Sequence, residues 1–145
     1  MRVGECMTRD VRLASPDQTI GEAAMIMAEI DAGALPVGDG DRLVGMLTDR
    51  DIAVRAVAQG LGPDTRVRDV MSSDIKYCFN DDDVDEVIDN MGDIKVRRLV
   101  VLNRDKRMVG IVSLGDLAKD GPTAQTGAAL NQICRPGGEH SQSAH

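Results

Sequence analysis

The chain contains two copies of one pattern, and this internal repeat constrains its fold more than any other feature. The stretch Gly45-Met46-Leu47-Thr48-Asp49-Arg50-Asp51 returns sixty-five positions later as Gly110-Ile111-Val112-Ser113-Leu114-Gly115-Asp116, with its Gly, hydroxyl and Asp in register. Upstream the offset is sixty-four, as between Met7-Thr8 and Met71-Ser72, so the extra residue lies in a polar turn. A repeat of this length is too long for a solenoid and too short for an average domain. We therefore expect two half-domains that share one core, with the function where the copies meet.

Composition limits both the core and the partners. A chain of 145 residues that is 42% hydrophobic can bury one compact core, and with one Tyr, one Phe and eight Met this core is aliphatic and soft. The net charge is -7 and both repeats are acidic, which argues against nucleic acid as a partner. The longest apolar stretch, residues 23–28, is too short for a membrane span, and the N-terminus lacks a signal-peptide pattern. These features predict a cytoplasmic protein with neither nucleic-acid nor membrane partners.

The cysteines and histidines are placed unfavourably for a metal site or for catalysis. Cys6, Cys78 and Cys134 form no C-x-x-C pair, and His140 and His145 lie near the C-terminus. This pattern argues against a zinc site and against Cys/His chemistry, and it favours three reduced, packed thiols. We therefore expect no metal site and no catalytic residues.

The hydrophobic pattern predicts an α+β fold in which each repeat reads β-α-β-β-α. Thr19 and Asp83 each precede a Glu by three positions, which is the signature of a helix start. Alternation and turn residues predict two hairpins, and Gly60 ends the last helix of the first repeat. The predicted elements are extended segments 10–14 and 74–79, helices 20–30 and 84–91, hairpins 34–37 with 43–47 and 98–102 with 108–112, and helices 49–59 and 114–118.

The predicted organisation has five parts. The first repeat covers residues 1–60, a linker covers 61–68 and the second repeat covers 69–120. A C-terminal segment, 121–134, contains a possible short helix at 126–133 that docks on the core. The remaining residues, 135–145, are rich in Gly, Ser, Gln and His and are predicted to be disordered.

The repeated motif Gly-x-x-Thr/Ser-x-x-Asp lies where a strand turns into a helix. Thr48 with Asp51, and Ser113 with Asp116, have the spacing of a helix cap, so each pair could simply close a helix end. The same position also offers free N–H groups and a hydroxyl to a phosphate, and an Asp one turn on can accept from ribose hydroxyls. The preceding Gly permits a close approach of the backbone. The two interpretations are helix capping alone and recognition of a nucleotide.

Three further features accompany these motifs: the strand Gly33-Ala34-Leu35-Pro36-Val37, the strand Val96-Arg97-Arg98-Leu99-Val100, and the Met-Thr/Ser openings of both repeats. Through this combination, residues 3–120 resemble the tandem cystathionine-β-synthase (CBS) domain pair, or Bateman module. The resemblance implies two repeats related by a pseudo-two-fold axis, clefts between them, and adenine nucleotides (AMP, ADP or ATP) as ligands. NAD or S-adenosylmethionine is also possible, and no tightly bound cofactor is implied.

The resemblance also implies roles for individual residues. Asp51 and Asp116 correspond to the ribose-binding acids, Thr48 and Ser113 to the phosphate-contacting hydroxyls, and Arg50 adds a phosphate charge. The second copy has Gly115 in place of this arginine and Val100 in place of the more usual Pro. Either Arg97 or Arg98 compensates for the missing charge, or these residues are simply solvated. The implied walls of the base pocket include Thr8, Val11, Pro36, Ser72, Ile75 and Val100.

Three classes of function follow from these observations. The first is a regulatory sensor without enzymatic activity that binds an adenine nucleotide and acts on an unknown protein in trans. The second is an oligomeric interaction module with no nucleotide ligand. The third, an enzyme acting on nucleotides, lacks a positioned nucleophile and base. We also expect a homodimer, because the Met-rich amphipathic helices beginning near Ile20, Asp49, Val84 and Leu114 have more apolar face than two half-domains can cover.

Overall fold

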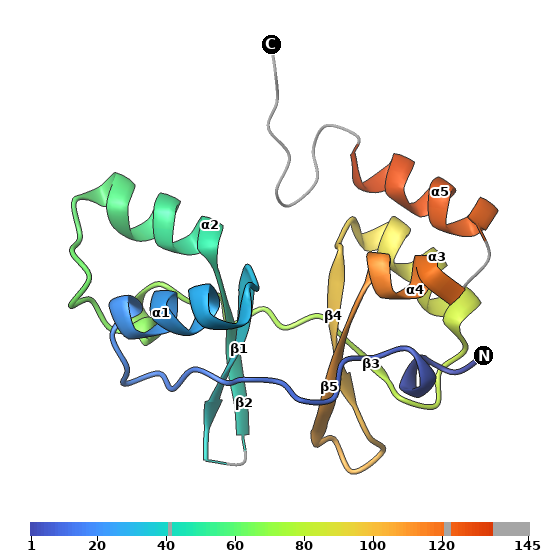
Figure 1. Ribbon diagram of the computed structural model, residues 1–145, viewed down its shortest axis with the longest axis horizontal. Coiled ribbons are helices and arrows are strands. Elements are labelled where there is room, and N and C mark those ends of the chain that lie inside the picture. The colour runs from blue at the N-terminus through green and yellow to red at the C-terminus, as the bar shows by residue number, and fades with distance from the viewer. Residues whose placement is uncertain (41, 121–122, 135–145) are drawn as a thin grey trace. The chain divides into compact units, whose positions relative to one another are not determined.

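The computed structural model describes residues 1–40, 42–120 and 123–134, which divide into two compact units. One unit is the continuous segment Arg12–Ile75, which we call the inner unit because it lies within the chain. The other, the outer unit, combines Met1–Val11 with the chain from Lys76 onward. Both units mix helices with a small sheet (Figure 1), as the α+β prediction requires.

The inner unit is a helix followed by a hairpin. Helix α1 (Ile20–Ile30) begins at the predicted capping box of Thr19 and Glu22 and ends at Asp31 in the left-handed conformation. Strands β1 (Ala34–Asp39) and β2 (Arg42–Thr48) pair antiparallel, with a bulge after Val37. The predicted extended segment 10–14 forms only one bridge, parallel, between Ala14 and Val37.

The helical segment after β2 is less regular than predicted. It starts as α2 (Asp49–Asp51), continues as a π-helical stretch (Ile52–Ala56) and finishes as a 3-10 turn (Val57–Gln59). Gly60 ends it with a φ of 79°, a left-handed conformation that glycine adopts at little cost. The predicted helix 49–59 is therefore present, but its hydrogen bonding changes along its length.

The outer unit has the same plan with one more strand and one more helix. Strand β3 (Tyr77–Phe79) pairs parallel with β4 (Arg98–Leu102), and β4 pairs antiparallel with β5 (Met108–Ser113). Helices α3 (Val84–Ile94), α4 (Leu114–Asp120) and α5 (Thr123–Ile133) complete the unit. The predicted docking helix is confirmed, because α5 packs on α3 and buries Ala129 and Ile133. The predicted disordered tail, 135–145, lies outside the described residues.

The segment that opens each repeat packs in the unit built by the other repeat. A 3-10 turn at Val3–Glu5 joins the outer unit, where the Val3 amide donates to Asp82 O at 3.0 Å. The corresponding turn at Val67–Asp69 joins the inner unit, where the Val67 amide donates to Gln18 O at 2.8 Å. These bonds correspond at the sixty-four-residue offset, so the compact units cross the boundaries of the sequence repeats.

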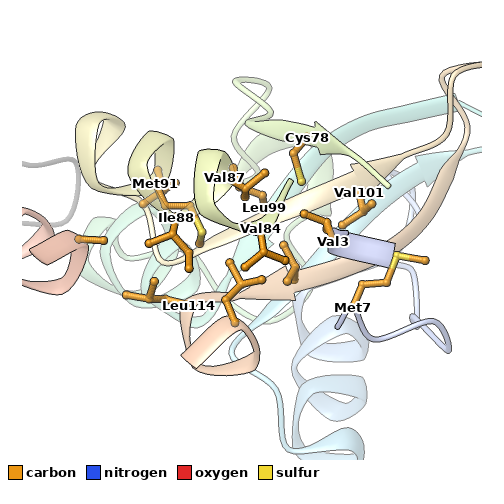
Figure 2. Close-up of a cluster of buried hydrophobic side chains, with 14 of the residues drawn as sticks. Val3, Met7, Cys78, Val84, Val87, Ile88, Met91, Leu99, Val101 and Leu114 are labelled. Carbon is orange, nitrogen blue, oxygen red and sulfur yellow. The ribbon is translucent and has the colours of Figure 1, made fainter. Parts of the chain in front are cut away.

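Each unit has its own hydrophobic cluster, so the expectation of one shared core is wrong. In the outer unit, Val3 and Met7 from the opening segment meet Val84 and Ile88 of α3 and Leu99 of β4 (Figure 2). The inner cluster is formed by Ala14, Ile20, Ala23, Met27, Leu35, Val37, Leu47, Ala56, Val67 and Val70. The exchanged opening segments explain the difference, because each half-domain gains from them enough apolar side chains to close its own core.

Candidate functional site

The hydroxyl–aspartate pairs of the two repeats have the same geometry. In the inner unit the Asp51 amide donates to Thr48 Oγ1 at 3.0 Å, and the Thr48 amide donates to Asp51 Oδ2 at 3.0 Å. In the outer unit the Asp116 amide donates to Ser113 Oγ, and the Ser113 amide to Asp116 Oδ2, again at 3.0 Å each. Both hydroxyls accept in these bonds, so their own protons remain available to donate. Each pair is therefore a capping box that retains a hydroxyl proton and a second carboxylate oxygen.

Asp51 is unusual in its burial. It is only 9% exposed, and it is the one charged residue classed as buried in the described part of the chain. Its Oδ1 lies 3.9 Å from Arg55 Nε, one helical turn away. The Arg55 guanidinium also donates to Val70 O at 3.3 Å and to Met71 O at 3.1 Å. Arg55 thus connects the buried carboxylate to the opening segment of the second repeat.

Sequence analysis did not single out Arg55. Its signal was the i,i+4 spacing from Asp51, a common arrangement for an ion pair on a helix. Nothing in the sequence indicates the carbonyl groups that it reaches, because these are 15 and 16 residues away.

The opening segments lie beside the hydroxyl–aspartate pairs. In the inner unit Ser72 and Met46 exchange two backbone hydrogen bonds of 2.9 Å, two residues before Thr48. In the outer unit Thr8 and Ile111 exchange two bonds of 2.8 and 3.0 Å, two residues before Ser113. Thr48 and Ser113, whose hydroxyls are predicted to contact phosphate, thus each lie near the opening segment of the other repeat.

The motif glycines are required by this arrangement. A Cβ on Gly45 would lie 2.7 Å from Ser72 O and 2.8 Å from Met71 Sδ. A Cβ on Gly110 would lie 2.6 Å from Thr8 O and 2.8 Å from the sulfur of the corresponding methionine, Met7. The close approach predicted for these glycines is therefore made by the protein's own opening segment.

The predicted wall residues divide between the two units. Ser72, Pro36 and Ile75 are in the inner unit, where Pro36 pairs with Met46, the residue that Ser72 bridges. Thr8, Val11 and Val100 are in the outer unit, where Val100 pairs with Ile111, the residue that Thr8 bridges. Pro36 and Val100 are buried, whereas Thr8 is exposed and Ser72, Ile75 and Val11 are half-buried.

The predicted cationic residues occupy different places in the two units. Arg50 follows Thr48 by two positions and is exposed, whereas the outer unit has Gly115 at this position. Arg98 lies on β4 directly opposite Ser113 and is also exposed. The side chains of Arg50 and Arg98 form no ion pair with any described residue. Each hydroxyl–aspartate pair therefore has a free guanidinium nearby, from the helical segment in one unit and from the strand in the other.

The described residues contain no group of three or more His, Cys, Asp or Glu side chains that could hold a metal ion. Within the same residues, no helix is long and apolar enough to cross a membrane. The two histidines, 140 and 145, lie outside the described part of the chain. The expectation of no metal site stays a prediction.

The comparisons with known proteins agree with the resemblance seen in the sequence. The sequence-family model of the CBS domain matches residues 3–57 and 67–121 of this chain. The CBS domain-containing protein YhcV of Bacillus subtilis is 40% identical over 132 residues, which cover 90% of this chain and 94% of that protein. Hypoxic response protein 1 of Mycobacterium tuberculosis is 37% identical over 134 residues, or 91% of this chain and 93% of that protein.

Solved structures give the same result. Hypoxic Response Protein I, whose structure has two coordinated zinc ions, matches with a TM-score of 0.74 and 37% identity over 84% of this chain and 100% of that chain. The CBS domain pair of protein MJ0100, in complex with 5′-methylthioadenosine and S-adenosyl-L-methionine, matches with a TM-score of 0.73 and 28% identity over 82% and 94%.

Proposed function

This chain belongs to the CBS domain family, and from that premise we propose that it is a regulatory module without enzymatic activity that binds adenine nucleotides, with one recognition site in each unit. The observation that carries the proposal is the repeated geometry of the hydroxyl–aspartate pairs, each placed beside an opening segment of the other repeat.

The chemistry of each pair suits a ribose next to a phosphate. In the inner unit, Asp51 Oδ2 is used by the cap and Oδ1 remains to accept from a ribose hydroxyl, while the Thr48 hydroxyl donates to a phosphate oxygen. Arg50 adds a positive charge for the phosphate. Asp116, Ser113 and Arg98 have these roles in the outer unit.

The proposed adenine pocket is aliphatic. Pro36 and Ile75 form its wall in the inner unit, and Val100 and Val11 in the outer unit, together with the backbone of the opening segments. Support for an adenosine ligand comes from MJ0100, whose CBS pair was solved with two adenosine compounds. AMP, ADP and ATP are the proposed class, with NAD and S-adenosylmethionine as further candidates.

The proposed role is that of a cytoplasmic sensor. A ligand that bridges Asp51 and the Ser72 segment would hold together two parts of the chain from different repeats, and would thereby stabilise the inner unit. The signal would pass to an unidentified protein in trans. The alternative, an oligomeric interaction module without a nucleotide ligand, is favoured by the fact that both pairs already satisfy each other as helix caps.

The test is a thermal-shift and calorimetric titration with AMP, ADP, ATP, NAD and S-adenosylmethionine. A ligand at about 100 times its Kd should stabilise the folded protein by roughly 2.7 kcal/mol. Asp51→Asn keeps an oxygen that can cap but removes the charge, so it should weaken binding at the inner site with little loss of stability.

Thr19→Ala is the matched control for Thr48→Ala. Each substitution removes a capping hydroxyl and should cost about 1 kcal/mol of stability, but only Thr48→Ala should reduce nucleotide affinity. If none of the five compounds shifts the melting curve at millimolar concentration, the alternative without a ligand is correct. Turnover of ATP by the pure protein would contradict the assignment as a module without enzymatic activity.

A further inference from the structure

The carboxylate of Asp51 is largely buried, yet one of its oxygens accepts no hydrogen bond. Oδ2 accepts from the Thr48 amide at 3.0 Å, whereas Oδ1 accepts from none of the described residues. In the described part of the chain, every side-chain oxygen that is shielded from solvent has a hydrogen-bond partner. Oδ1 must therefore reach the surface, although Asp51 as a whole is only 9% exposed.

A carboxylate in this environment needs a compensating charge, and Arg55 supplies one without occupying Oδ1. The Arg55 Nε lies 3.9 Å from Oδ1, which is close enough for attraction but too far for a hydrogen bond. The Arg55 Nη1 donates instead to Val70 O at 3.3 Å and to Met71 O at 3.1 Å. A bidentate pair between Arg55 and Asp51 would use both carboxylate oxygens. Because the two carbonyls hold the guanidinium, Oδ1 stays available to a ligand.

The same two bonds fix the chain after the 3-10 turn Val67–Asp69. Carbonyls at the end of a helical turn lack partners within it, and a basic side chain is a common donor to them. The next residue, Ser72, exchanges two bonds of 2.9 Å with Met46 of β2. Residues 70–72 are therefore held at the inner site by the guanidinium and by this backbone bridge.

The second repeat lacks this arginine. At the sixty-five-residue offset, position 55 corresponds to Asp120. Asp116, the counterpart of Asp51, is half-buried, whereas Asp51 is buried. The greater burial of Asp51 thus coincides with the presence of Arg55, as expected if the arginine offsets the cost of removing the carboxylate from water.

We propose that Arg55 is a positioning residue of the inner site. It offsets the charge of Asp51 while leaving Oδ1 free for a ribose hydroxyl, and it holds residues 70–72 beside the site before the ligand arrives. A site that is ordered in advance binds more tightly, because binding does not have to order it. The inference rests on the proposed function and adds to it that Arg55 acts through Asp51 and residues 70–72, without contacting the phosphate.

The test is a calorimetric titration with AMP and with ATP, in an Asp116→Asn background that leaves the inner site intact. Arg55→Gln removes the charge and should raise both Kd values on the order of 10-fold, as when the binding-competent fraction falls to about one tenth. The loss should be similar for AMP and ATP, because Arg55 acts on the ribose contact. Arg55→Lys keeps a charged donor and should recover part of the affinity.

Arg66→Gln is the matched control. Arg66 also donates to a backbone carbonyl, Asp17 O, and it precedes the same 3-10 turn. Arg55 and Arg66 are both exposed, so the variants should keep the fold, which circular dichroism checks. Arg66→Gln should lower stability to a similar extent and leave both Kd values unchanged.

The outcomes separate this inference from the proposed function. If the original chain binds AMP or ATP and Arg55→Gln binds them equally well, the inference is wrong and the proposed function stands. A loss confined to ATP would make Arg55 a phosphate ligand and would overturn the positioning role, as would an equal loss of affinity in Arg66→Gln. If the original chain binds neither compound, the proposed function fails and the inference fails with it.

Discussion

Replacing Gly110 with Ala should destabilise the packing of the opening segment, Met1–Val11, against strand β5 of the outer unit. The added Cβ would lie 2.6 Å from Thr8 O and 2.8 Å from Met7 Sδ. The Met7 side chain could adjust, but the carbonyl is backbone and is fixed by its hydrogen bond from the Ile111 amide at 3.0 Å. The structure must therefore either absorb the overlap or release the segment.

The magnitude follows from these two possibilities. Overpacking of a close contact costs about 1–3 kcal/mol, and loss of the two bonds between Thr8 and Ile111 costs about 1 kcal/mol each. We expect a destabilisation of about 3 kcal/mol, which corresponds to a decrease in Tm of roughly 10 °C for a domain of this size. Gly45→Ala should behave in the same way in the inner unit, where the clash is with Ser72 O at 2.7 Å.

Gly62→Ala is the control, because a Cβ at that position meets nothing within 4 Å. Thermal and urea unfolding give the free-energy difference, and amide hydrogen exchange at Thr8 and Ile111 reports whether the segment has separated locally. The reasoning is refuted if Gly110→Ala is as stable as Gly62→Ala and both amides remain protected.

Three further predictions follow from other residues. Gly127→Ala should stabilise the protein by about 0.5–1 kcal/mol in urea unfolding, since Gly127 lies in α5 with open space around it. Burial, and then the charge of Asp82, raises the pKa of Cys78 from 9.0 to about 12, so the folded thiol holds its proton longer than the unfolded one. The stability that the protonated Cys78 thiol contributes is present below pH 9 and should be lost as the pH rises towards 12. In the folded protein, a thiol reagent at pH 8 should label the exposed Cys134 before Cys78. Arg50→Gly, which copies the second motif, should reduce the preference for ATP over AMP and the salt dependence of binding in calorimetry, and unchanged values would assign Arg50 to solvation.

The elements that sequence analysis predicted well are those specified by nearby residues. The Thr19–Glu22 box, the two hairpins and the docking helix at 126–133 all appear in the structure. Asp83 caps α3 through the Asp85 amide, so the start of the helix was right, although the expected partner, Glu86, was not used. The hydroxyl–aspartate pairs are present as their spacing in the sequence predicts, because each hydrogen bond joins residues only three positions apart.

The sequence by itself determined the repeat, its helices and hairpins, and the two hydroxyl–aspartate pairs, because these depend on hydrogen bonds and apolar spacing over a few residues. Only the tertiary structure decided which opening segment lies beside which pair, as the bridge from Thr8 to Ile111 joins residues from opposite ends of the chain. It also decided that each unit closes its own core and that α5 packs on α3 and α4. These arrangements depend on how segments distant in the sequence pack together. The corresponding segments of the two repeats have nearly equivalent sequences, so no local sequence pattern indicates which of them will pack together.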